Sequence, residues 1–192
     1  MRMNRTEAAK NRERVVQTAS EMFRKDGYDG TGIAALMKAS GLTNGAFYKQ
    51  FASKEALIAE ATAHGLGENE AHWQKVLEQA EGDPLQAITD WYLSEPHLSH
   101  RGLGCTYATL ATEAPRHEED VQKAFDQSIR RTLSLLSGAA ETGDTSDGAG
   151  EGEREDAAIR HLSRLVGALI LARAVAGSTL ADRIVAANKS PD

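Results

Sequence analysis

The segment GLTNGAFYKQFASKE (residues 41–55) has the pattern of a tight turn followed by two helix starts. Gly41 suits the turn, because glycine adopts left-handed backbone conformations without steric cost. Thr43 and Ser53 belong to the residue types that cap helix N-termini, so each predicts a helix immediately after it. With a further helix before Gly41, the pattern predicts a helix-turn-helix over about residues 32–51.

The residues before this segment predict the helices that brace it. Apolar residues in the stretch 11–23 recur at helical spacing, and Gly27 supplies a C-terminal stop. Thr31 is then predicted to cap the second helix. The side chains predicted to face the core of this module are Val15, Val16, Ala19, Met22, Phe23, Ile33, Leu36, Met37, Ala46, Phe47, Phe51, Leu57, Ile58 and Ala61.

The rest of the chain also predicts helices, so we expect an all-α fold. Aromatic residues are 5% of the composition, and period-two strand patterns are weak. We expect a DNA-binding module over residues 1–62 and a second helical module, for ligand binding and dimerisation, over residues 63–192. The acidic, glycine-rich segment 141–156 predicts a flexible loop before the last long helix.

Charge divides the chain in the same way. Residues 1–60 carry a balance of +3 and residues 61–192 a balance of −9, within a total of −6. The acidic total does not exclude nucleic acid as a partner, because phosphates respond to the local surface. The longest strongly apolar run, residues 165–172, is too short to span a bilayer. With a single cysteine and no signal-peptide pattern, we expect a cytoplasmic protein with no membrane partner.

The turn and the helix after it also have the composition of a DNA-reading surface. No Asp or Glu occurs from Gly41 to Ser53. Small residues allow close approach to DNA, an amide reads base edges, and lysines bind phosphates. The predicted DNA contacts are Thr31, Thr43, Asn44, Gly45, Tyr48, Lys49 and Lys54. From spacing alone, a helical hairpin with a merely polar outer face is an equal alternative.

A family resemblance extends this interpretation. Gly41, Thr43, Gly45, Tyr48, Phe51, Lys54 and Leu57 fit the pattern Gly-x-Ser/Thr-x-Gly-x-x-Tyr-x-x-Phe-x-x-Lys-x-x-Leu, after Gly27-Tyr28, Thr31 and Ile33. Over about residues 10–62 the chain therefore resembles the N-terminal domain of TetR-family transcriptional repressors. It departs from the family at Met37, usually alanine, and at Gly32, usually a larger residue.

The resemblance implies an all-helical homodimer that binds a pseudo-palindromic operator and is released by a small-molecule ligand. A two-fold dimer would place its recognition helices about one DNA turn, roughly 34–36 Å, apart. The resemblance implies no cofactor. A constitutive DNA-binding regulator without a ligand is the alternative. An enzyme is disfavoured, because no catalytic motif or phosphate loop stands out in the sequence.

The helix predicted over about residues 154–176 carries, within the stretch 158–177, a belt of apolar residues wider than one buried face needs. It predicts either a central buried helix or a helix shared between its own module and a second subunit. Family precedent favours the second interpretation. The predicted dimer contacts are Leu162, Leu165, Val166, Leu169 and Ile170.

The ligand site has weaker signals. Large or polar-tipped side chains that could line a cavity are Trp73, Trp91, Tyr92, His97, Tyr107 and Phe125, and each could equally be plain core or surface. Glu95, His97, His100 and Glu113 do not have the spacing of a metal site, so we expect no metal.

Cys105 has two interpretations. It stands at a predicted helix start, where backbone amides and Arg101 would lower the pKa of a thiol and make it reactive. A Gly-Cys pair here resembles a branch of the family in which a cysteine senses electrophiles. The alternative, and the favoured one, is a small buried cysteine that acts as a hydrophobic residue.

Overall fold

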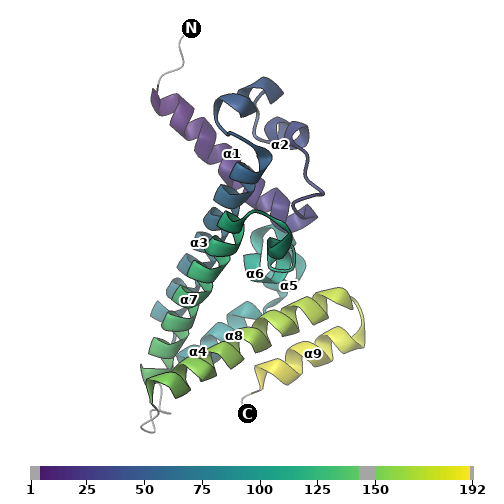
Figure 1. Cartoon of the computed structure of the whole chain (residues 1–192). Helices are drawn as coiled ribbons and strands as arrows, with labels where there is room; N and C mark the ends of the chain where they lie inside the picture. Colours follow the sequence, from purple (N-terminus) through teal and green to yellow (C-terminus); the bar gives the residue numbers. More distant parts are fainter. Residues whose placement is uncertain (1–4, 143–149, 191–192) are drawn as a thin grey trace.

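The computed structural model describes residues 5–142 and 150–190, and within them the secondary structure is entirely helical (Figure 1). The all-α prediction is confirmed. The elements are α1 (Arg5–Asp26), α2 (Ile33–Ala39), η1 (Asn44–Lys49), α3 (Lys54–Glu78), α4 (Pro84–Tyr92), α5 (Glu95–Ser99), η2 (Arg101–Leu103), α6 (Thr106–Leu110), η3 (Ala114–Arg116), α7 (Glu119–Thr142), α8 (Glu151–Ala174) and α9 (Thr179–Lys189).

The N-terminal module follows the predicted order of elements. Gly41 has a φ of +69°, which explains why glycine occupies the turn between α2 and η1. Phe47 and Phe51 are buried together, with ring centroids 5.5 Å apart. The Ser53 hydroxyl caps α3 by accepting a hydrogen bond from Ala56 N at 3.0 Å. The element after the turn is a short 3₁₀ helix, and Thr43 precedes it without a side-chain cap.

The prediction that Thr31 caps the second helix was wrong. Gly32 occupies the N-cap position of α2 and provides no side-chain hydrogen bond. The Thr31 hydroxyl instead points back and donates to the carbonyl of Gly27 at 3.2 Å. This bond closes the glycine turn that follows α1, so Thr31 stabilises the turn rather than the helix.

Helix α3 continues without a break from the N-terminal module into the rest of the chain (Figure 1). The predicted boundary at residue 62 falls inside it and stays a prediction. Gly65 marks the closest approach of neighbouring helices: a Cβ there would lie 2.6 Å from Ser20 Oγ of α1 and 2.9 Å from Thr106 Oγ1 of α6. The missing side chain thus allows α1, α3 and α6 to pack against one another.

The C-terminal elements form a helical layer against α3. Helix α7 lies along α3, α8 packs against α7, and α9 folds back on α8 (Figure 1). Asp83 caps α4 as its position before a proline suggests, accepting from Leu85 N at 2.9 Å. None of the described helices is long and apolar enough to cross a membrane.

The predicted loop over residues 141–156 was wrong at its C-terminal end. Helix α8 begins at Glu151, so residues 151–156 are helical. The Glu153 carboxylate accepts a hydrogen bond from Gly150 N at 3.1 Å, and acidic residues in a first turn favour a helix N-terminus. The loop prediction from composition therefore failed at residues 151–156, because the acidic residues there stabilise the start of a helix. Residues 143–149 of the predicted loop lie outside the described residues.

Candidate functional site

Helix η1 presents a surface free of acidic side chains at one end of the molecule. Five of the predicted DNA contacts are exposed on it: Thr43, Asn44, Gly45, Tyr48 and Lys49. Tyr48 is 70% exposed, and its ring stands edge-on to the buried ring of Phe47 at a centroid distance of 5.1 Å. The core residue therefore supports the exposed ring from below. Lys38, in the last turn of α2, is also exposed and was missed by the sequence analysis.

The other two predicted DNA contacts lie elsewhere. Thr31 is 1% exposed, so its side chain is withdrawn from the surface. Lys54 is half-buried, and its ammonium group donates to the carbonyl of Tyr28 at 2.7 Å. That bond ties the start of α3 to the segment between α1 and α2. We therefore keep neither residue in the proposed set of principal DNA contacts.

Tyr28 docks the N-terminal module onto the C-terminal elements. Its backbone N–H donates to the Glu113 carboxylate at 3.0 Å, and its hydroxyl shares a hydrogen bond with Thr62 at 2.7 Å. The ring of His117 stands edge-on to it, with centroids 4.7 Å apart. Burial raises the pKa of Tyr28 to about 12, so the phenol is neutral near pH 7.

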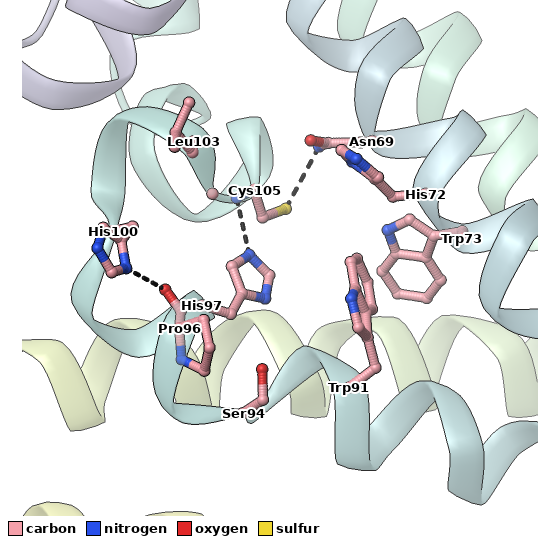
Figure 2. Close-up of a pocket in the computed structure, with 11 residues that line it drawn as sticks. Asn69, His72, Trp73, Trp91, Ser94, Pro96, His97, His100, Leu103 and Cys105 are labelled. Atoms are coloured by element: carbon pink, nitrogen blue, oxygen red, sulfur yellow. Dashed lines mark hydrogen bonds between the residues drawn. The ribbon is translucent and has the colours of Figure 1, made fainter.

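A cavity of about 330 Å³ opens further along α3, toward its C-terminal half (Figure 2). Its walls come from α3, α4, α5 and the segment 100–105 that leads through η2 to α6. The lining residues are Asn69, His72, Trp73, Trp91, Ser94, Pro96, His97, His100, Leu103, Gly104 and Cys105. His72, His100 and Leu103 are exposed, so they form the rim.

The structure brings half of the predicted ligand-binding side chains into this cavity. Trp73, Trp91 and His97 line it, whereas Tyr92, Tyr107 and Phe125 do not. Tyr92 is fully buried. The Tyr107 hydroxyl is occupied by Ser128 and Thr132 at 2.7 and 2.9 Å, next to the buried ring of Phe125. The missed residues cluster in SEPHLSHRGLGC (residues 94–105), whose glycines and histidines interrupt the helical pattern and were a usable signal.

His97 is held in one tautomer at the centre of the wall. Its Nε2 accepts from Cys105 N at 2.9 Å, so the proton lies on Nδ1, which donates to the carbonyl of Tyr92 at 2.7 Å. Burial lowers the pKa of His97 to about 4. The imidazole is therefore neutral at physiological pH and links α4, α5 and the start of α6.

Cys105 stands at the start of α6 as predicted, and its burial agrees with the favoured interpretation of a small buried cysteine rather than with a reactive thiol. The side chain is 3% exposed, and burial raises the pKa of the thiol. Asn69 Nδ2 lies 3.4 Å from Sγ. With this amide turned over, its oxygen accepts from Thr106 N at 3.1 Å and its nitrogen donates to Gly65 O at 3.2 Å, which satisfies both ends. The surroundings of Cys105 thus favour the neutral thiol.

Comparisons with known proteins extend over both the N-terminal module and the C-terminal helices. The family model described as "Bacterial regulatory proteins, tetR family" matches residues 15–61, which include α2, η1 and the start of α3. This segment of the chain therefore matches the TetR-family N-terminal domain.

Relatives of similar length extend the match beyond the DNA-binding module. The HTH-type transcriptional repressor NemR of Escherichia coli K12 is 27% identical over 144 residues, covering 73% of this chain and 72% of its own. The repressor DhaR of Mycobacterium sp. GP1 is 21% identical over 136 residues, covering 69% and 68%. The chain is therefore similar to named repressors along most of its length.

Solved structures show the same fold. The reduced form of Escherichia coli NemR superposes with a TM-score of 0.77 at 25% identity, covering 94% of this chain and 95% of that one. A TetR regulator from Chloroflexus aurantiacus superposes with a TM-score of 0.79 at 23% identity, covering 96% and 94%. TetR-family regulators bind DNA and are typically dimers with small-molecule effectors.

The predicted dimer contacts fall into two groups in this structure, some buried and some at the surface. Leu165 and Leu169 are fully buried within their own chain, whereas Leu162 is 7% exposed and lines an apolar groove, so their assignment to a subunit interface stays a prediction. Ile170 is exposed, as is Ile159, which the prediction missed, and Val166 is half-buried. They border an apolar groove of about 410 Å³ between α7 and α8, lined by Tyr107, Ala111, Ile129, Leu133, Ile159, Leu162, Ser163, Val166, Gly167 and Ile170.

Proposed function

We propose that the chain is a repressor that binds a pseudo-palindromic operator as a homodimer and leaves it when a small molecule fills the cavity. One observation carries the proposal: a single helix, α3, connects the acid-free face of η1 to the cavity. Lys54 starts α3 next to η1, and Asn69, His72 and Trp73 present the same helix to the cavity. An enzyme with a catalytic site does not fit this division of the molecule as well.

The exposed face of η1 suits the major groove. A helix that enters this groove uses its exposed first turns for base edges and its flanks for phosphates. Asn44 and Tyr48 would meet bases or sugars, while Lys49 and Lys38 would meet phosphates. Both lysines are exposed, and neither forms an ion pair within the part of the chain that the structure describes.

The apolar groove between α7 and α8 is the proposed dimer surface. Exposed apolar side chains that gather in one place mark association surfaces more often than free surface. Ile159 and Ile170 are large apolar residues left exposed by the chain itself. Two-fold pairing of this face would bury them and fix the separation of the two η1 surfaces.

A direct contact connects the cavity wall to α1. Arg24, buried in the last turn of α1, donates from Nε to the carbonyl of Gly102 at 2.8 Å. Its Nη1 pairs with Glu68 of α3 at 2.8 Å. Gly102 adjoins Leu103 and Gly104, which line the cavity. A ligand that displaces residues 103–104 would therefore move the carbonyl that holds α1. This favours a ligand-responsive regulator over a constitutive one.

Genomic footprinting tests the proposed function as a whole. Purified protein is incubated with fragments that flank its own gene, since such regulators often act locally, with random duplexes of equal length as the control. We expect a protected site made of two half-sites about 10 bp apart between centres, or a multiple of that spacing. The complex should contain an even number of chains. A monomer without preference for any fragment would contradict the proposal.

Arg24→Met tests the coupling contact. For a compound that releases the operator from the wild-type chain, we expect the ratio of operator affinities without and with that compound to fall toward one in the variant. Typical coupling spans about 5- to 150-fold, and methionine keeps the buried stem while removing both hydrogen bonds. Affinity of the compound in the absence of DNA should change little.

The matched control is Lys25→Met, which removes the same charge from the exposed neighbouring position. It is expected to keep the wild-type ratio, because only the bonds of Arg24 reach the cavity wall. An Arg24→Met variant with the full wild-type ratio would remove this contact from the mechanism.

A further inference from the structure

We propose that the cavity binds an uncharged, planar aromatic molecule of one or two fused rings that carries a hydroxyl or carbonyl group. This inference rests on the proposed function for its regulatory meaning, but the binding itself can be measured without DNA. It follows from the walls, the charges and the polar groups of the cavity.

The walls are formed largely by rings. Trp91 lies between His72 and His97, with centroid distances of 6.2 and 5.4 Å and interplanar angles of 40° and 34°. Trp73 stands edge-on to Trp91 at 6.2 Å and 75°. Figure 2 shows both indoles bordering the open space, with Pro96 and His97 across from them in this view. Such walls favour a flat ring, because aromatic pairs gain from offset stacks and edge contacts at about 4.5–7 Å.

The lining carries no formal charge. Among the residues that the structure describes, no Asp, Glu, Lys or Arg lines the cavity. His97 cannot supply a cation near pH 7, since its pKa is about 4 and both ring nitrogens are engaged. Burying an unpaired charge is costly, so a neutral ligand fits better than an ion.

The nearest charges are already engaged. Arg24 and Glu68 line an adjoining pocket of about 280 Å³ and pair with each other at 2.8 Å. Arg173 lies behind Gly104 and donates to the carbonyls of His97 and Leu98 at 2.5 and 3.2 Å. Nη1 of Arg173 is the exception, since it has no hydrogen-bond partner among the described residues. Arg173 does not line the cavity, however, so an anionic ligand would have to displace Gly104 to reach it.

A few polar groups remain for one edge of the ligand. The Ser94 hydroxyl lines the cavity, and the rings of His72 and His100 stand at its rim. They offer a donor and acceptors at the border of an otherwise ring-lined space. A volume of about 330 Å³ is near the lower end of the range of about 300–1,000 Å³ for ligand pockets, so the ligand is small.

Calorimetry with four matched probes tests the ligand class on the full chain without DNA. The probes are 2-naphthol, 2-naphthoate, 2-naphthylmethylammonium and the saturated alcohol 2-decalol. We expect 2-naphthol to bind at least about tenfold more tightly than each of the others, because only it combines flatness with neutrality. Tighter binding of the naphthoate would overturn the proposal in favour of an anion held by Arg173. Equal binding of the decalol, or no binding of the naphthol, would overturn it as well.

Variants locate the binding. Trp91→Ala should weaken the binding of 2-naphthol at least about tenfold. Trp91→Phe should retain most of the affinity, since a stacking ring remains. Leu180→Ala, an exposed apolar residue on α9, is the control and should bind like wild type. Melting curves check that each variant is folded. If Trp91→Ala loses affinity for 2-naphthol while Trp91→Phe retains it, the loss reports the missing ring and not a misfolded protein. Unchanged affinity in Trp91→Ala would overturn the site.

Operator binding separates this inference from the proposed function. If 2-naphthol binds at Trp91 but leaves operator affinity unchanged, the ligand class stands and release by ligand fails. If the naphthol does not bind while a compound of another class releases the operator, the proposed function stands and the ligand class fails.

Discussion

Tyr48→Ala is expected to weaken operator binding about 10- to 100-fold, the loss of a contact worth about 1–3 kcal/mol. Tyr48 is 70% exposed on the acid-free face of η1, so its removal takes away contact with DNA but little packing. Fluorescence anisotropy with a labelled operator at fixed salt measures the affinity. Thermal unfolding should be nearly unchanged, since surface substitutions stay within about 0.5 kcal/mol. Wild-type affinity would take Tyr48 off the DNA surface.

Salt dependence supplies the control for this variant. Lys49→Ala should flatten the log–log slope of affinity against salt by about one unit, as expected when one phosphate contact is lost. Lys54→Ala should flatten it less, because the Lys54 ammonium is bound to the carbonyl of Tyr28. Tyr48→Ala should leave the slope as it is, since it removes no charge. A slope that falls equally in all three variants would contradict this division of roles.

Phe47→Ala is expected to destabilise the N-terminal module by about 3–5 kcal/mol, the usual cost of removing a buried phenyl ring. Phe47 is fully buried and contacts the rings of both Tyr48 and Phe51. Urea unfolding followed by circular dichroism measures the loss. Operator binding should fall with it, because the exposed ring of Tyr48 loses its support.

Phe47→Leu is the matched control, because leucine keeps most of the buried volume and should cost well under half as much. The two neighbouring positions would then differ in their effect on stability: Tyr48→Ala lowers operator affinity alone, whereas Phe47→Ala lowers both stability and operator affinity. A Phe47→Ala variant as stable as wild type would show that the ring does not hold η1 in place.

The N-terminal module could be predicted because its signals are local. Gly41 marks its turn by conformational necessity, and Ser53 caps the helix that it directly precedes. Thr31 shows the limit of such reasoning. Its residue type suits an N-cap, but the hydroxyl found a closer partner in the carbonyl of Gly27. Residue type indicates which residues suit turns and helix caps, but it does not determine which nearby backbone group such a side chain will bond.

The cavity was harder to predict because three separate segments form it. Trp73 and Trp91 stood out by size, whereas Asn69 and His72 have no signal until α3 is placed against the segment 94–105. Cys105 shows the same dependence on tertiary structure. Its place at a helix start argued for a low pKa, but burial by distant parts of the chain reversed the direction.

The outward face of α8 was predicted only in part for a related reason. A wide apolar belt indicates that two sides of a helix are covered, but not which residues face which side. Leu165 and Leu169 point into their own chain, and Ile159 and Ile170 point away from it. The packing of α8 against α7 and α9 makes that choice, and this packing cannot be obtained from the period of the sequence alone.

The placement of Trp73 and Trp91 has a practical consequence. They are the two tryptophans of the whole chain, and both border the same cavity. Indole emission excited at the red edge of the absorption band therefore comes from this one location, without any label. A shift in its wavelength or intensity reports a change of polarity beside these rings, which makes the native protein its own optical sensor for occupancy in a compound screen.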